Sequence, residues 1–213
     1  QSIPIGLPPG IAGNTPSLSI SYGSDRGNGL LGVGWDLSRE AIQRDTSRGV
    51  PQYDDSQNVD AFLFSGQELV YVGMGDYRGT PYKEYRLKQE GSFARFEYYD
   101  STSSAPYWVV RKDGVEVIYG KDEGSRLMGK SVTGLQGVFA WYVCEQKRLG
   151  DSIRYVYTML PGGRIEPFII TYSDFRIEFD YGTANRGDVV GLIGSGVRRV
   201  LSNRLEAIRV FHS

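Results

Sequence analysis

The side chains that most often carry enzyme chemistry are scarce in this sequence. The 213 residues include one histidine, His212, and one cysteine, Cys144. These two counts exclude an internal disulfide, most zinc sites and most catalytic triads, because each of these needs several such side chains. Cys144 alternates with Tyr142 and Ala140 along an expected strand, so we predict a buried apolar thiol there, and an ordinary strand residue at His212. We therefore expect no catalytic residue and no metal ligand.

One string matches a phosphate-binding loop. Residues 124–131 read Gly-Ser-Arg-Leu-Met-Gly-Lys-Ser, which places Lys130 where such a loop holds the phosphates. The chemistry also requires a helix to begin directly after the lysine, because the helix N-terminus faces the anion. Residues 132–137 instead carry two glycines and two β-branched residues ahead of an expected strand. We predict an ordinary connection, with a P-loop nucleotide-binding protein as a remote alternative.

A second glycine string resembles a dinucleotide-binding fingerprint. Gly27, Gly29 and Gly32 have the required spacing, but Val33, Gly34 and Trp35 follow in place of a helix. Glycines without a Cβ allow a strand to bend sharply while an aromatic ring packs against it. The segment is therefore predicted to be a tight turn.

Oxygen-bearing side chains recur at every second position from residue 54, as at the start of a calcium loop: Asp54, Ser56, Asn58 and Asp60. The glycine and the bidentate glutamate that such a loop needs are replaced by Val59 and Ser65. A polar turn is the favoured interpretation, with calcium binding as the lesser one.

Two carboxylates share one face of an expected strand and suggest acid and base chemistry on a sugar. Glu178 and Asp180 lie two residues apart, with Arg176 on the same face. The opposite face carries Phe175, Ile177, Phe179 and Tyr181, which favours a core on that side and solvated acids on the other.

The composition indicates strands rather than helices. Glycine (28), tyrosine (15) and phenylalanine (9) are abundant, and apolar residues recur at every second position. We expect an all-β fold with antiparallel sheets forming a sandwich, a barrel or an open curved shell, and very little helix. Strands are predicted at 17–22, 61–64, 68–72, 82–87, 94–99, 168–172, 175–181 and 206–211. Short candidate helical stretches occur at 38–44 and 200–205.

The clearest local structure is a hairpin from Tyr107 to Tyr119. Asp113 and Gly114 supply the two positive-φ positions of a type I′ turn. The register then pairs Lys112 with Val115, Arg111 with Glu116, Val110 with Val117, and Trp108 with Tyr119. A second hairpin is predicted from 138–143 through a turn at 148–151 into 153–157.

Charge and hydropathy exclude some partners. The 24 basic and 25 acidic residues give a net charge of −1, which disfavours nucleic acid and anionic membranes as partners. No stretch approaches the roughly 18–20 apolar residues of a membrane span. No low-complexity linker divides the chain, so residues 1–213 are predicted to be a single domain, with weak boundary candidates at 161–163 and 187–196.

The opening segments resemble a known family. The run Leu7-Pro-Pro-Gly-Ile-Ala-Gly-Asn-Thr-Pro-Ser-Leu-Ser-Ile-Ser-Tyr22, followed by Gly27-Asn-Gly-Leu-Leu-Gly-Val-Gly-Trp-Asp-Leu37, is similar to the N-terminal domain of the Salmonella virulence plasmid B protein. The same domain begins the B components of insecticidal Tc toxin complexes, which are relatives of Rhs shell proteins. The similarity continues through 42–44, 49–55, 62–70, 112–114, Trp141, 150–157 and 203–208.

The resemblance implies a β-rich structural module rather than an enzyme. In Tc complexes this domain forms part of a hollow shell that holds a toxic segment, and the ADP-ribosylating activity of the Salmonella protein resides in a separate C-terminal domain. The chain is expected to be a fragment of a larger secreted bacterial protein. Its expected partners are other domains of that protein or toxin-complex subunits, and the resemblance implies no cofactor.

The leading hypothesis is a non-enzymatic scaffold, with a carbohydrate or receptor-binding domain as the alternative. A scaffold wall needs continuous sheet and glycine bends, whereas the alternative predicts a solvent-facing cluster of Tyr and Trp. The residues expected to matter are structural: Gly27, Asn28, Gly29, Gly32, Gly34 and Trp35 in the turn, and Asp113 and Gly114 in the hairpin.

Overall fold

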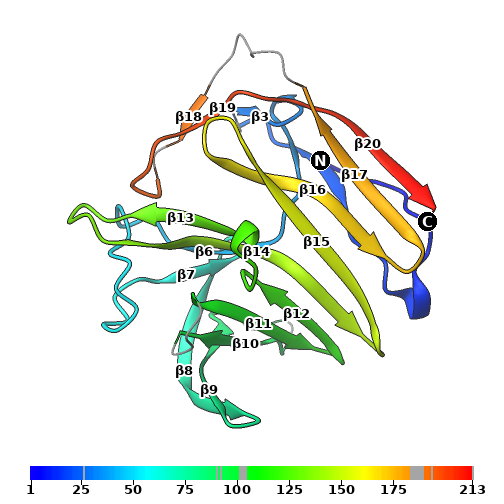
Figure 1. Cartoon of the computed structure of the whole chain (residues 1–213). Coiled ribbons are helices and arrows are strands. Elements are labelled where there is room, and N and C mark those ends of the chain that lie inside the picture. Colours follow the sequence, from blue (N-terminus) through cyan, green and yellow to red (C-terminus); the bar gives the residue numbers. More distant parts are fainter. Residues whose placement is uncertain are drawn as a thin grey trace. The chain divides into compact units, whose positions relative to one another are not determined.

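Antiparallel strands make up nearly all the regular structure of this protein (Figure 1). The computed structural model describes residues 1–25, 27–89, 91, 93–100, 105–182, 190–192 and 194–212. The only helical elements among them are two single 3₁₀ turns, η1 (Ile11–Gly13) and η2 (Glu123–Ser125). The predicted all-β fold is confirmed. Within the described residues, no helix is both long and apolar enough to cross a membrane.

The chain divides into two compact units. One comprises residues 1–39, 150–192 and 198–213, and the other comprises residues 40–149 and 193–197. Each unit has its own buried core.

The first unit contains two main sheets. One sheet has the strand order β1-β2-β5-β4-β3, with bounds Ser2–Pro4, Ser19–Tyr22, Trp35–Leu37, Gly32–Val33 and Asn28–Gly29. The other runs β15-β16-β17-β20, with bounds Asp151–Leu160, Arg164–Tyr172, Phe175–Tyr181 and Leu205–His212. A short ladder joins β18 (Val190–Leu192) to β19 (Arg199–Leu201).

Apolar side chains from both sheets form the core of this unit. Leu18, Leu30 and Leu37 come from the N-terminal segment, and Ile153 and Ile177 are among those supplied by the other sheet. Alternate residues of a strand point to opposite faces, so each strand sends every second side chain inward. The unit is therefore a β-sandwich, one of the architectures that the sequence predicts.

The second unit is a closed barrel of eight antiparallel strands. Its members are β6 (Ala41–Arg44), β7 (Phe62–Phe64), β8 (Gln67–Tyr77), β9 (Thr80–Leu87), β10 (Arg95–Tyr99), β11 (Tyr107–Lys112), β12 (Val115–Tyr119) and β14 (Gln136–Arg148). Consecutive strands pair from β6 to β12, and β14 closes the ring by pairing with both β12 and β6. Strand β13 (Arg126–Lys130) lies on β14.

Aromatic rings fill the barrel interior. Trp108 and Trp141 are completely buried, and their ring centroids lie 6.1 Å apart. Phe62 lies edge-on to both, at 5.0 Å and 5.8 Å. Tyr98 tilts onto Trp108 at 4.5 Å. Such tilted and edge-on pairs stabilise by about 0.5–1.5 kcal/mol each beyond the area that they bury.

The hairpin of β11 and β12 has the predicted register. Lys112 pairs with Val115, Arg111 with Glu116, Val110 with Val117, and Trp108 with Tyr119. Asp113 and Gly114 have φ values of 49° and 74°, as a type I′ turn requires.

The other predicted strands are also present, with longer bounds for β8, β9 and β16. Between β14 and β15, Leu149 and Gly150 both have positive φ, so the chain turns at the predicted place. The two candidate helical stretches are wrong. Residues 41–44 are strand β6, held between β7 and β14, and residues 199–201 are strand β19. In the candidate boundary at 187–196, residues 187–189 and 193 lie outside the described residues.

Several buried tyrosines predict a loss of stability in alkali. Burial raises the pKa of Tyr98 and Tyr85 in the barrel and of Tyr181 in the sandwich, and burial together with the neighbouring Glu97 raises that of Tyr99. In the unfolded chain these phenols ionise near pH 10, whereas in the fold they stay neutral. We therefore expect their stabilising contribution to be complete below about pH 10 and to decrease above it.

The measurement is tyrosinate absorbance in the near ultraviolet, followed with far-ultraviolet circular dichroism as the pH rises. These tyrosines are expected to ionise only as the sheet signal is lost. If all 15 tyrosines ionise near pH 10 while the sheet signal is unchanged, the expectation is wrong.

Candidate functional site: a glycine-rich turn and an exposed hairpin

The glycine-rich turn of residues 27–35 forms the tight β3-β4-β5 strand connection of the sandwich. Asn28 pairs with Val33, and Gly29 with Gly32. A Cβ on Gly29 would lie 2.0 Å from the carbonyl oxygen of Trp35, far inside van der Waals contact. The backbone of β5 therefore approaches β3 at a distance that only glycine allows.

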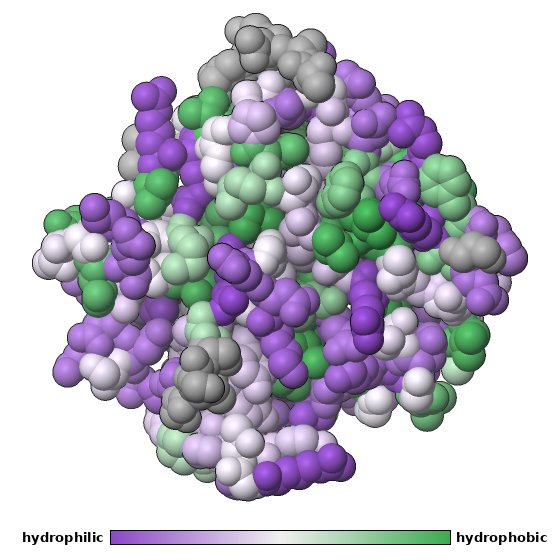
Figure 2. Space-filling view, in the orientation of Figure 1, coloured by the Kyte–Doolittle hydropathy of each residue, from purple (hydrophilic) through white to green (hydrophobic). Residues whose placement is uncertain are grey.

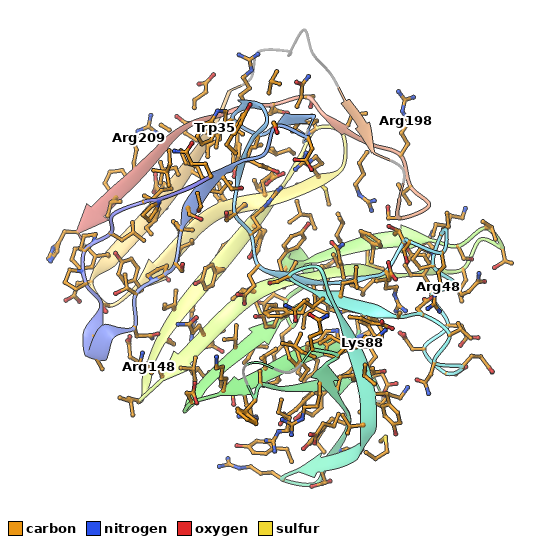
Figure 3. All side chains as sticks on the ribbon, turned by 180° about the vertical axis from the view of Figure 1, so that it is seen from behind. Trp35, Arg48, Lys88, Arg148, Arg198 and Arg209 are labelled. Atoms are coloured by element: carbon orange, nitrogen blue, oxygen red, sulfur yellow. The ribbon has the colours of Figure 1, made fainter. Side chains whose placement is uncertain are left out.

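Gly34 and Trp35 pack on the neighbouring strand. Gly34 has φ +75°, and a Cβ there would lie 2.5 Å from the Tyr22 ring. Trp35, which is labelled in Figure 3, pairs with Tyr22 in the β2–β5 ladder. The ring centroids of these two residues are 5.1 Å apart. Gly32 also has a positive φ, of 126°, whereas Gly27 has open space around it. The segment holds three short strands and no helix to receive a dinucleotide.

The phosphate-loop string at 124–131 begins at the end of the 3₁₀ turn η2 and continues as extended chain. Residues 126–130 form β13, which pairs with β14, and a turn follows Lys130 in place of a helix. Ser131 uses its hydroxyl to accept a hydrogen bond from the Leu135 amide at 3.0 Å. Gly129 lies against Tyr53, whose hydroxyl would be 1.9 Å from an added Cβ. The backbone therefore lacks the anion-binding geometry of a P-loop, and the nucleotide-binding alternative fails on this geometry.

The polar loop at 54–60 surrounds a buried arginine that the sequence analysis did not single out. Arg44 is 0% exposed and donates from Nε to the Val138 carbonyl oxygen, from Nη1 to Asp60 and from Nη2 to Asp55, each at 2.8 Å. Asp60 also accepts from the backbone amides of Gln52 and Tyr53, at 2.8 Å each. The side chain of Asp54 bonds locally to Ser56. Among the described residues no group of acidic, His and Cys side chains has the arrangement of a metal site.

Aromatic faces and carboxylates together hold the Arg44 charge. The guanidinium carbon lies 5.2 Å from the Tyr53 and Phe62 ring centroids and 5.4 Å from that of Trp141. Burial alone would lower the pKa of Arg44, but attraction to Asp55 and Asp60 leaves this pKa raised. The side chain is thus a permanently charged part of the barrel core.

Two further acids are completely buried, and neither was predicted. Glu97 accepts a hydrogen bond from Tyr99 at 2.8 Å and lies 2.7 Å from Arg95 and 3.1 Å from Arg111. Glu166 pairs with Arg164 at 2.9 Å and with Arg39. Both acids have cationic neighbours in the sequence or across a strand pair. This was the one feature of the sequence that could have indicated buried ion pairs. Each is part of an ion-pair network with arginines.

The acids that suggested sugar chemistry pair with arginines on the open face of β17. Glu178 lies 2.8 Å from Arg176, and Asp180 lies 2.9 Å from Arg209. Ile177 and Phe179 on the opposite face are buried, as predicted. Arginine side chains therefore balance the charges of the two acids on a partly solvated surface.

The cysteine, the histidine and the tryptophans lie in strands or in the barrel core. Cys144 is buried, and burial raises the pKa of its thiol, which disfavours the thiolate needed for attack. His212 lies in β20, with its ring 5.2 Å from that of Phe175. Trp108 and Trp141 are in the barrel interior and Trp35 is half-buried, so two of the three tryptophans are unavailable for an exposed sugar-binding platform.

An exposed apolar surface lies on strand β8. Val70, Val72 and Met74 are 44%, 60% and 63% exposed, and a bulge interrupts the β8–β9 register between Tyr71 and Gly73. The bulge shifts the alternation, so Val70, paired with Arg86, and Met74, paired with Lys83, lie on opposite faces of the strand. We call this exposed stretch of three apolar side chains the β8 surface. On the face drawn in Figure 2, hydrophilic and hydrophobic residues are interspersed. Apolar residues grouped on one exposed strand are typical of a contact surface for another protein segment.

A family model matches most of the chain. Residues 1–161 match the model described as Salmonella virulence plasmid 65kDa B protein. Mono(ADP-ribosyl)transferase SpvB of Salmonella choleraesuis strain SC-B67 and of Salmonella typhimurium are each 31% identical over 174 residues. That alignment covers 72% of this chain and 29% of each relative. The chain thus spans less than a third of the length of the curated relatives that it matches.

Solved structures share the whole fold. The N-terminal domain of effector protein SpvB from Salmonella typhimurium strain LT2 superposes with a TM-score of 0.81 at 24% identity, covering 99% of this chain and 87% of that one. TcdB2-TccC3-Cdc42 gives a TM-score of 0.84 at 21% identity, with 100% and 13% covered. The Tc holotoxin pore of Photorhabdus luminescens gives 0.82 at 21%, with 99% and 13% covered.

Proposed function

The chain belongs to the Salmonella virulence plasmid 65kDa B protein family, and from this premise we propose that it is a non-enzymatic structural module of a secreted bacterial toxin or Rhs-like protein. Its role is to contribute β-sheet wall to a toxin-encapsulating shell or to a partner assembly. The observation that carries the proposal is the likeness of the entire chain to 13% of the much longer TcdB2-TccC3 chains.

The chemistry of the described residues supports a structural role. The buried charges Arg44, Glu97 and Glu166 are each engaged by opposite charges, and the single described cysteine is buried. The close approaches at Gly29 and Gly34 serve strand packing. We propose that the transferase activity named for the relatives belongs to the part of those proteins that this chain does not match.

The first experiment tests the absence of transferase activity. The chain is incubated with labelled NAD and a cell extract, beside full-length Salmonella mono(ADP-ribosyl)transferase as the positive control. We expect label on extract proteins only with the control enzyme. Transfer of label by this chain alone would overturn the non-enzymatic role.

The second experiment tests whether the β8 surface contacts other parts of a larger assembly. Met74→Cys places a reactive thiol on this surface, and the wild-type chain supplies the background because Cys144 is buried. The thiol is expected to react rapidly with a maleimide in the isolated chain and slowly in the complete product of the gene. Denatured samples show that both forms can be labelled, and equal rates in the two folded forms would count against the wall role.

A further inference from the structure

The barrel has a cavity at one end that its aromatic core does not fill. The cavity has a volume of about 610 Å³, and the described residues that line it all belong to the barrel unit. Sites for small molecules typically have about 300–1,000 Å³, and an eight-stranded barrel is wide enough to hold one small ligand. This size is therefore appropriate to a single ligand rather than to a bridging water.

Apolar side chains form the floor and one wall of the cavity. Phe64 lies edge-on to Phe96 at 5.0 Å and to Tyr119 at 6.3 Å, and all three rings line the cavity. Val110 and Val117 face each other across β11 and β12 and complete the wall. Valines at these inward positions are much smaller than Trp108 and Tyr119 at the next paired positions, which leaves room for the cavity.

Two cations stand at the rim on the same face as these valines. Lys112 pairs with Val115, and Val115 pairs with Arg148 across the next strand, so the three side chains share one face of the sheet. All three line the cavity, and both cations are exposed. Figure 3 shows Arg148 at the end of β14.

The cations on the two faces of these strands differ in whether they form ion pairs. Arg111 and Lys147, one residue before each rim cation, point to the other face and pair with Glu116. Neither Lys112 nor Arg148 has an ion-pair partner among the described residues. The acids at the cavity are placed otherwise: Glu40 accepts a hydrogen bond from the Tyr119 hydroxyl, and Asp113 is in the turn of the hairpin.

We propose that the barrel mouth binds one small amphiphile that has an aliphatic chain and a single carboxylate. The chain lies on Phe64, Phe96 and Val117, and the carboxylate lies between Lys112 and Arg148. An apolar wall with unpaired cations at its rim matches this chemistry, because the carboxylate gains charge-assisted hydrogen bonds while the chain leaves water. This site is independent of the wall role proposed above.

The probe is decanoate, used below its micelle-forming concentration and measured by isothermal titration calorimetry on the intact chain. We expect one site per chain. Decanol, which lacks the charge, and decylammonium, which reverses it, are expected to bind at least about tenfold more weakly, since neither can accept charge-assisted hydrogen bonds from both cations. No binding of decanoate, or equal binding of decylammonium, would overturn the proposal.

Variants locate the site. The double variant Lys112→Ala/Arg148→Ala is expected to lose at least about tenfold in decanoate affinity. Lys88→Ala/Lys147→Ala removes the same charge from elsewhere on the barrel and is expected to bind as the wild type does. Val117→Trp fills the cavity and is expected to abolish binding while circular dichroism stays unchanged. Unaltered affinity in Lys112→Ala/Arg148→Ala, or in folded Val117→Trp, would contradict the assignment.

Discussion

Replacing Arg44 by alanine is expected to lower the free energy of unfolding by about 3–5 kcal/mol. The guanidinium makes three hydrogen bonds in the barrel interior, two of them to carboxylates. Its loss leaves Asp60, whose side chain is 7% exposed, without its cationic partner, and opens a space among three aromatic rings. Unfolding in urea, followed by tryptophan fluorescence, measures the effect because Trp141 lies against Arg44.

Two variants separate the charge from the geometry. Arg44→Met/Asp60→Asn removes both charges and keeps the volume, so it is expected to recover part of the loss. Lys88→Ala deletes an exposed cation whose pair with Glu68 is solvated, with an expected cost of about 0–1 kcal/mol. If Arg44→Ala unfolds at the same urea concentration as Lys88→Ala, Arg44 does not hold the barrel core together.

Gly29→Val is expected to lower stability by about 3 kcal/mol, the upper end for an overpacked site. For a chain of this size this corresponds to a decrease of about 6–12 °C in the thermal midpoint. The cause is the carbonyl oxygen of Trp35, which would lie 2.0 Å from the new Cβ and is backbone, so it moves only with the whole of β5. Differential scanning calorimetry measures the midpoint.

Gly27→Val is the matched control. Gly27 lies two residues away in the same turn, with nothing within 4 Å of an added Cβ and no positive φ. Its expected change is within about 0.5 kcal/mol, as at most open surface positions. Equal midpoints for the two variants would refute the close approach of β3 and β5.

Local pattern was sufficient for the hairpins and for most strand positions. The register of β11 and β12 follows from two turn residues, because Asp113 and Gly114 select the turn type and the turn type fixes every pair after it. The false phosphate-loop motif was also recognised locally, from the β-branched residues and glycines that follow Lys130. Such features depend on neighbours within a few residues.

Features that depend on distant partners were not predictable. Residues 38–44 have helix-forming composition, yet 41–44 become strand because β7 and β14 supply hydrogen bonds on both sides. Arg44 reads as a surface charge until the loop at 52–60 and the Val138 carbonyl surround it. Whether the chain forms a barrel, a sandwich or both is likewise decided by pairings that no short window contains.

The ring of the barrel is completed only by β14, which joins Gln43 to Ala140 and Val115 to Arg148. During synthesis on the ribosome, the barrel therefore cannot close before Arg148 has left the exit tunnel. Until that point β6 to β12 can form at most an open meander. Until then Trp108 and Phe62 lack their contact with Trp141, and we expect this part of the core to be more exposed to solvent. Because β14 pairs with strands distant in the sequence, we expect closure of this barrel to be a late, nonlocal step in folding.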